Sequence, residues 1–180
     1  MPRKRRFTVL FLSVLFFVFF IAGCEKIAGL KEIKKIEIGK PAPDFVLQDV
    51  SGNTWKLSSL KGKAVFINFW ASWCKPCRDE MPSMEALNKA MAGQPFQMLA
   101  IVFNDDLDTA NRFARRLGVT FPVLVNPEPE LTEAYMITGV PETFLIDANG
   151  ILRHRFIGPY NWDTPEMITL VQELLNSPKG

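Results

Sequence analysis

Long apolar runs alternate with amphipathic segments through the middle and the end of the chain. The runs fit strands buried on both faces, because they lack the polar alternation of a half-exposed strand. They are Lys63 to Trp70, Phe96 to Phe103 and Thr143 to Asp147. Apolar residues recur at helical spacing in three further segments, Lys75 to Met91, Leu107 to Leu117 and Thr164 to Leu175. Strands alternating with helices predict an α/β layer structure whose inner strands are parallel.

Two turn signals add antiparallel hairpins to this pattern. Phe45 to Leu57 contains two β-like runs around Ser51-Gly52-Asn53, which predicts a hairpin near the start of the folded part. Asp147-Ala148-Asn149-Gly150 turns the last apolar run into Ile151 to Ile157. The sheet is therefore expected to close with an antiparallel hairpin.

The N-terminus has the pattern of a secretory signal peptide. The basic residues Arg3 to Arg6 precede an apolar stretch from Phe7 to Ala22, which leads into Ile-Ala-Gly-Cys24, the form of a bacterial lipobox. This predicts cleavage before Cys24 and attachment of lipid to its sulfur, and two or three acyl chains hold a protein durably on a membrane. The alternative is an uncleaved membrane helix. With either anchor the positive cluster stays inside, so the body faces the periplasm or the extracellular side.

Length, charge and composition fit one globular domain behind this anchor. We expect a signal peptide at 1–23, a lipidated N-terminus and tether at 24–38, an α/β domain at 39–177 and a tail at 178–180. The 180 residues are 48% hydrophobic, enough for a sizeable core. The net charge of +2 comes from the N-terminal basic cluster, without which the 19 acidic residues outnumber the basic ones. No basic surface is left for nucleic acid, so that class of partner is excluded.

Cys74 and Cys77 form a C-x-x-C pair directly after the first apolar run. A structural zinc site needs four ligands. Cys24 belongs to the signal and His154, expected on the solvated surface, is the only histidine, so no metal is expected. A purely structural disulfide is the second alternative, but closing so short a loop stabilises a fold little. A dithiol that exchanges with other disulfides explains the spacing best, and an extracytoplasmic compartment permits it.

The residues around the pair suit this chemistry. Trp70, expected in the core, ends the apolar run, and Ser72 is expected to cap a helix that starts near Cys74. A helix N-terminus favours a thiolate at Cys74, which is the form that attacks. Cys77, one turn further on, can return the attack and release the product. Pro76 fits the first helical turn, where its missing N–H has no intrahelical partner to lose.

Three stretches carry a resemblance to a known family. WCKPC, Trp73 to Cys77, after the strand FINFWAS resembles the active site of the thioredoxin fold. GKPAPDFVLQDVSGNTWKLSSLKGK, Gly39 to Lys63, is similar to the N-terminal hairpin of the TlpA/ResA-like membrane-anchored oxidoreductases. YMITGVPETFLIDANG, Tyr135 to Gly150, looks like a segment of the DsbE/CcmG branch. The resemblance implies a thioredoxin fold, a central mixed sheet flanked by helices with an N-terminal β-hairpin extension.

Peroxiredoxins share the P-A-P-D-F opening and are the closest rival family. Their peroxidatic cysteine lies in a P-x-x-x-T-x-x-C context, whereas Trp70 to Cys77 reads WASWCKPC. The peroxiredoxin motif does not fit this stretch, so a peroxiredoxin-like antioxidant stays only as an alternative.

The resemblance also implies a substrate groove. Pro141 is expected to be a cis-proline that faces the disulfide, and the backbone of Val140 is expected to pair with an extended substrate. Trp73 is expected at the rim of the site. Lys75 and Pro76, between the cysteines, complete the groove.

Two acidic residues are the remaining candidates. Thioredoxins carry a buried Asp six residues before the attacking cysteine, but Asn68 occupies that position here and cannot take a proton. Glu80, three residues after Cys77, is the expected substitute, because a carboxylate beside a thiol raises the thiol pKa and can accept its proton. Its alternative is a solvated acid in the first helical turn. Glu142 is expected to add negative charge to the groove.

The resemblance implies a tethered thiol-disulfide oxidoreductase that acts as a reductant of extracytoplasmic substrate proteins. The expected substrate is apocytochrome c during cytochrome c maturation, and the expected electron source is a membrane thiol donor of the CcdA/DsbD type. No cofactor is expected. The alternative from another class is a non-catalytic binding lipoprotein with a structural disulfide.

Overall fold

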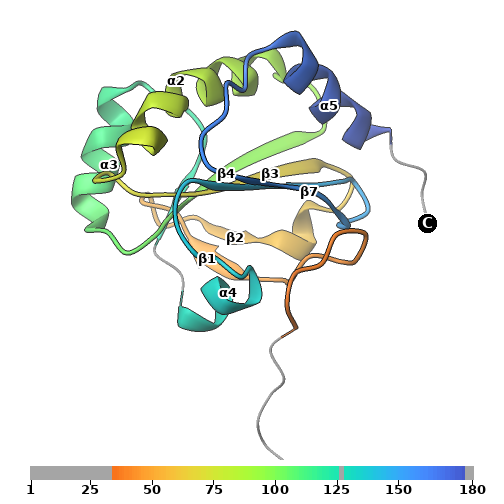
Figure 1. The fold of residues 1–180 in the computed structure, drawn as a ribbon, viewed down its shortest axis with the longest axis horizontal. Helices are drawn as coiled ribbons and strands as arrows, with labels where there is room; N and C mark the ends of the chain where they lie inside the picture. The colour runs from red at the N-terminus through yellow and green to blue at the C-terminus, as the bar shows by residue number, and fades with distance from the viewer. Residues whose placement is uncertain (1–33, 126–127, 177–180) are drawn as a thin grey trace, which may run out of the picture. The chain divides into compact units, whose positions relative to one another are not determined.

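The computed structural model describes residues 34–125 and 128–176, which belong to one compact unit. A five-stranded sheet with the order β5-β4-β3-β6-β7 lies at its centre, and a separate hairpin, β1-β2, lies below it in the view of Figure 1. The strands are β1 (Val46–Gln48), β2 (Thr54–Lys56), β3 (Ala64–Trp70), β4 (Phe96–Val102), β5 (Val123–Leu124), β6 (Glu142–Ile146) and β7 (Leu152–Ile157). The helices are α2 (Lys75–Ala90), α3 (Leu107–Arg116), α4 (Pro129–Ala134), α5 (Pro165–Leu175) and the 3-10 helix η1 (Leu57–Leu60).

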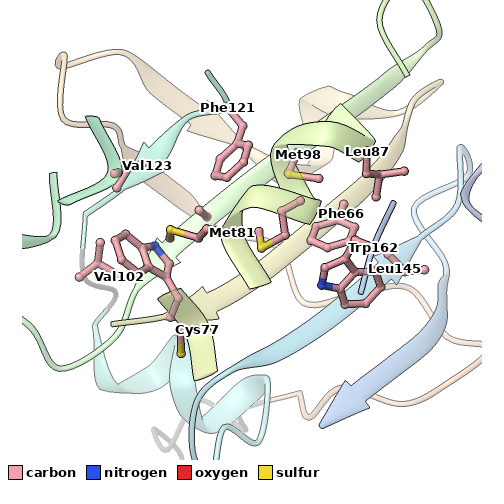
Figure 2. Packing of buried hydrophobic residues seen from close by; sticks show 14 of the residues in the cluster. Phe66, Cys77, Met81, Leu87, Met98, Val102, Phe121, Val123, Leu145 and Trp162 are labelled. Atoms are coloured by element: carbon pink, nitrogen blue, oxygen red, sulfur yellow. The ribbon is translucent and has the colours of Figure 1, made fainter. Parts of the chain in front are cut away.

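Strand β3 is central, and all seven of its residues are buried. Successive side chains of a strand point to opposite faces, so an apolar strand of this kind supplies two cores. On one face, Phe66 packs edge-on against Trp162 beneath α2, α3 and α5 (Figure 2). On the other face, Phe69 packs with Tyr135 and Phe144 beside α4 and the β1-β2 hairpin.

The thioredoxin-type architecture that the resemblance implied is confirmed, including its mixed central sheet. Strands β3, β4 and β5 are parallel to one another, as the alternation of strands and helices predicted. Strand β6 is antiparallel to β3, although it was expected among parallel inner strands. The N-terminal hairpin and the closing hairpin β6-β7 are both present and antiparallel.

The bounds of the expected strands and helices agree with the structure to within one or two residues. Three short elements were not predicted, the four-residue 3-10 helix η1, the two-residue strand β5 and the six-residue helix α4. None of them is long enough to show a clear hydrophobic period.

The segment before β3 pairs with the β5 edge of the central sheet and with the start of the β7 edge. At the β7 edge, the Gly39 N–H donates to the Leu152 carbonyl, and the Leu152 N–H donates to the Lys40 carbonyl. At the β5 edge, the Val50 N–H donates to the Val123 carbonyl. Unpaired sheet edges invite pairing with other chains, and these contacts shorten the edge that is left unpaired.

The expected anchor region lies almost entirely outside the described residues, Cys24 included. The described end of the expected tether contains Ile36, which is buried and donates its N–H to the Ala134 carbonyl at 2.7 Å. Within residues 34–125 and 128–176, no helix has the length and apolar character to cross a bilayer.

Candidate active site

The cysteine pair lies where β3 ends and α2 begins. Cys74 is the N-cap of α2, and its Sγ accepts a hydrogen bond from the Cys77 N–H at 3.2 Å. Ser72 was expected in this role, but its N–H donates to the Asp105 carboxylate instead. Pro76 lies in the first turn, as expected. The backbone donors of the helix N-terminus therefore point toward Cys74, where they favour a thiolate.

Cys74 and Cys77 form a disulfide, with their Cα atoms 5.3 Å apart. The two residues differ in access, because Cys74 is 5% exposed and Cys77 is 0% exposed. Cys77 lies at the margin of the apolar cluster of Figure 2, below Met81 in that view. An incoming sulfur can therefore reach Cys74 but not Cys77.

The segment before β6 faces this disulfide. The Val140–Pro141 peptide bond is cis, as the resemblance implied. The carbonyl oxygen of Val140 lies 3.5 Å from the Cys74 Sγ. The Pro141 carbonyl accepts the Gly158 N–H at 2.9 Å, which joins the segment to the end of β7.

Glu80 is buried on the α2 face of the sheet, so it is not a solvated first-turn acid. Its Oε1 accepts from the Asn68 Nδ2 at 3.0 Å. Its Oε2 accepts from the Tyr160 N–H at 3.1 Å and from the Trp162 indole Nε1 at 3.2 Å. All three donors are neutral groups. Glu80 follows Cys77 by one helical turn, so the two buried residues lie on the same face of α2.

Burial raises the pKa of Glu80 to about 7, against the opposing effect of its hydrogen bonds with Tyr160, Trp162 and Asn68. Removing a carboxylate from water disfavours its charged form, and no cation among the described residues pairs with it. A carboxyl with a pKa near neutrality can both accept and return a proton at physiological pH.

Glu80 could be predicted from the sequence, but most of the residues that hold it could not. Tyr160 and Trp162 come from the loop between β7 and α5, some eighty residues away along the chain. Thr143 accepts a second hydrogen bond from the Asn68 Nδ2 at 2.9 Å and so orients that amide. The clue in the sequence was a pair of aromatic residues in a polar, Gly- and Pro-containing stretch, Gly158 to Asp163.

Trp73 and Lys75 lie at the surface beside the disulfide. Trp73 is 58% exposed, but its indole Nε1 donates to the Asn104 carbonyl at 3.0 Å, which fixes the ring at the rim. Lys75 is exposed and forms an ion pair with Asp79 at 2.6 Å. Part of its positive charge is thus compensated away from the sulfur atoms.

Glu142 was expected to add negative charge to the substrate groove, but it does not lie there. Its neighbour Thr143 contacts Asn68 on the α2 face, so the Glu142 side chain points to the other face of the sheet. There it is 1% exposed and paired with Arg155, with 2.7 Å between Oε2 and Nη2. Its carboxylate is buried and compensated, and it does not present a negative charge to the groove.

Within the described part of the chain, no group of acidic, Cys and His side chains could hold a metal ion. His154, expected on the solvated surface, is half-buried with its ring 6.1 Å from that of Phe156. Burial lowers the pKa of His154.

Comparisons with known proteins agree with this geometry. Residues 38–155 match the AhpC/TSA family. The thiol-disulfide oxidoreductase ResA of Geobacillus kaustophilus is 40% identical over 123 residues, which cover 68% of this chain and 71% of that protein. The chain belongs to the ResA-like thiol-disulfide oxidoreductases of the AhpC/TSA family.

Further relatives give the same picture. ResA of Bacillus subtilis is 38% identical over 117 residues, 65% of each chain. A crystal structure of a thioredoxin-family thiol:disulfide interchange protein from Chlorobium tepidum matches with a TM-score of 0.68 and 34% identity, over 77% of this chain and 98% of that one. The protein is thus a thioredoxin-fold disulfide oxidoreductase with Cys74 and Cys77 as its redox-active pair.

Proposed function

We propose that the protein reduces disulfides in extracytoplasmic proteins, with Cys74 as the attacking thiol and Cys77 as the resolving thiol. The observation that carries the proposal is the burial of Glu80 beside the pair, among neutral donors only. Such a carboxyl suits a dithiol that must lose and regain a proton in every cycle.

The first step is attack by the Cys74 thiolate on a substrate disulfide. A bond forms between the Cys74 sulfur and one substrate sulfur, the substrate S–S bond breaks, and the second substrate sulfur leaves as a thiolate. The helix N-terminus at Cys74 lowers the free energy of the attacking thiolate.

The second step is resolution by Cys77. Glu80 takes the proton of the Cys77 thiol, and the new thiolate attacks the Cys74 sulfur. The mixed disulfide breaks, the first substrate sulfur leaves as a thiolate, and Cys74 and Cys77 are joined. Two electrons have passed to the substrate, and the Glu80 proton is available to one of the released thiolates.

The groove around Cys74 suits an extended polypeptide. The Val140 carbonyl lies beside the Cys74 Sγ, where it can accept a backbone N–H of the substrate. Large apolar side chains are exposed on Trp73, which precedes Cys74, and on Ile157 and Tyr160, which flank the Gly158 contact with Pro141. They offer contact area for residues next to the substrate cysteine.

Glu80 also favours reduction over oxidation as the physiological direction. A disulfide is strongly oxidising when its reduced form is stabilised by an easily formed thiolate. The Glu80 carboxylate disfavours thiolate at the pair, whereas Lys75 is exposed and ion-paired, so it contributes about 1 kcal/mol at most.

The cellular setting of the proposal comes from the N-terminal sequence and the family resemblance. A lipid on Cys24 would hold the domain at the outer face of the membrane. There a membrane thiol donor of the CcdA/DsbD type would reduce the disulfide again after each turnover. The C-x-x-C-H haem site of apocytochrome c is the proposed substrate, since it must be reduced before haem is attached.

Insulin reduction tests the proposal. The reduced wild type is expected to precipitate insulin chains with dithiothreitol as electron source, above the dithiothreitol background, and Cys74→Ser is expected to abolish the acceleration. Equal rates for the two proteins would contradict it and favour a non-catalytic binding lipoprotein. Consumption of hydrogen peroxide without insulin reduction would instead favour a peroxiredoxin-like antioxidant.

A further inference from the structure

The buried Glu142 forms an ion pair with the half-buried Arg155 on the sheet face opposite Glu80. The Glu142 Oε2 accepts from the Arg155 Nε at 3.0 Å and from its Nη2 at 2.7 Å. The guanidinium carbon lies 5.6 Å from the centre of the Phe144 ring. Two hydrogen bonds and a stacked ring hold the planar guanidinium in one orientation.

The same pair holds the segment that joins α4 to β6. The Arg155 Nη2 also donates to the Met136 carbonyl at 2.8 Å. The Glu142 Oε1 accepts from the Thr138 N–H at 3.0 Å and from its Oγ1 at 3.2 Å. Met136 has φ +53°, in the left-handed region, which a residue with a side chain adopts only where surrounding contacts hold it.

This segment ends at the residue that faces the disulfide. Gly139, between Thr138 and Val140, contributes no side chain. The position of the Val140 carbonyl, 3.5 Å from the Cys74 Sγ, therefore depends on the Thr138 anchor before it and on the Pro141 contact with Gly158 after it.

We propose that Arg155 is a positioning residue for disulfide exchange, acting through Glu142. The ion pair fixes the Met136–Val140 segment, so that the Val140 backbone is already placed to pair with an extended substrate beside Cys74. The inference rests on the proposed function and deepens it. Its distinctive consequence is that Arg155 affects exchange with a polypeptide but not exchange with a small dithiol, which needs no backbone pairing.

The β6-β7 hairpin supplies a matched control at its other end. The Arg153 Nε lies 2.7 Å from the Asp147 Oδ2, and the Asp147 side chain is fully buried. Asp147 also accepts backbone N–H groups of a turn, from Asn149 and Ile151. Both arginines thus pair with a buried acid that holds a turn, but only Arg155 lies at the disulfide end of the hairpin.

The test compares Arg155→Met with Arg153→Met in the full chain. Two rates are measured by stopped flow: oxidation of the reduced protein by a disulfide-bonded peptide, and reduction of the oxidised protein by dithiothreitol. Arg155→Met should slow the peptide reaction about tenfold, equivalent to about 1.4 kcal/mol, and leave the dithiothreitol reaction within about twofold. Arg153→Met should lower the melting temperature but change neither rate.

Two further variants keep the test decisive. Arg155→Lys retains the charge but not the planar fork, so its peptide rate should lie between those of the wild type and Arg155→Met. Thr138→Ala removes one hydrogen bond of the segment and leaves the ion pair intact. It replaces Arg155→Met in the test if that variant fails to fold, and it should slow the peptide reaction but not the dithiothreitol reaction.

The inference is overturned if the folded Arg155→Met protein matches the wild type with peptide, or if both of its rates fall together. It is also overturned if Thr138→Ala, standing in for an unfolded Arg155→Met, leaves the peptide rate unchanged. Failure of the wild type to react with the peptide at all would count against the proposed function instead.

Discussion

Glu80 and Glu142 lie near the same disulfide on opposite faces of the sheet, and both are buried. Neutral groups of Asn68, Tyr160 and Trp162 surround the Glu80 carboxyl. The Glu142 carboxyl instead meets the guanidinium of Arg155. The two carboxyls are buried to a similar extent, so what distinguishes the two sites is the charge of the groups that donate to the carboxyl.

Glu80 and Glu142 thus show two different uses of a buried acid. Neutral donors compensate only part of the cost of burying a negative charge, so the pKa of Glu80 rises to about 7 and its proton becomes exchangeable. Arg155 compensates the charge of Glu142 directly, and the Glu142 carboxyl holds the Met136–Val140 segment in place through its hydrogen bonds. On this account Glu80 serves the chemistry of Cys77, and Glu142 serves the position of Val140.

The largest effect should come from removing the thiol on which Glu80 acts. Cys77→Ser should still attack through Cys74 and then stop, because no second thiol can release the substrate. A mixed disulfide between Cys74 and the substrate should accumulate, visible as an added mass by mass spectrometry. Cys74→Ser is the control and should form no adduct. Normal turnover by Cys77→Ser would invert the roles of the two cysteines.

Glu80→Gln should slow turnover at pH 7 by about 10²-fold, the lower end for loss of a general acid-base group. Without the carboxylate the Cys77 thiol should ionise more easily, so its pKa should fall. The reduced form is then favoured, and the reduction potential should rise by about 30 mV, equivalent to about 1.4 kcal/mol. The wild-type potential should lie nearer that of thioredoxin, about −270 mV, than that of DsbA, about −120 mV.

A redox titration against dithiothreitol and glutathione measures the reduction potentials of the wild type and of Glu80→Gln. Glu142→Gln is the matched variant on the other sheet face, and it should leave the Cys77 pKa unchanged. A wild-type potential near that of DsbA would contradict the reductant role.

The stability of the oxidised protein should depend on pH through Glu80. Its folded pKa of about 7 lies above the ordinary value of 4.5, so the folded state binds this proton more tightly than the unfolded state. The resulting stabilisation is complete below pH 4.5 and disappears as the pH rises through 7. Between pH 4 and pH 8 the wild type should lose about 3 kcal/mol more than Glu80→Gln. Urea unfolding measures this, and parallel pH profiles for the two proteins would refute it.

The smallest effect concerns one donor to Glu80. Trp162→Phe removes the indole N–H, which favours the charged carboxylate, so the pKa of Glu80 should rise further, by up to about one unit. The inflection in the pH dependence of the exchange rate should move up with it. Trp70→Phe is a close control, since Trp70 is also buried and its Nε1 has no hydrogen-bond partner among the described residues. An inflection that moves equally in both variants would count against the Trp162 contact.

Local patterns were enough to predict much of the fold and the centre of the site. The C-x-x-C spacing, the apolar run before it and the G-x-P-E-T-F segment each lie within a short stretch of chain, so Cys74, Cys77 and Pro141 could be recognised. Glu80 could be proposed because it shares a helix with Cys77 and lies one turn away.

The remaining features depend on contacts between distant parts of the chain. Tyr160, Trp162 and Arg155 act through hydrogen bonds to partners up to 82 positions away, and no local spacing reveals these. The direction of β6 was missed for a related reason. The connection from β4 to β6 is long enough to return the chain either way, and hydrophobicity alone does not encode strand direction.

The most direct test of the account is the titration of the Glu80 carboxyl itself. Carbon-13 NMR of the oxidised protein, labelled at glutamate side chains, can follow each carboxyl from pH 3 to pH 9, with Glu80→Gln used to assign the signal. A midpoint near pH 7 is expected for Glu80. A midpoint near the ordinary value of 4.5 would show that Glu80 is ionised throughout the physiological range. A carboxylate of such low basicity would be a poor acceptor for the Cys77 proton, and the proposed mechanism would fail.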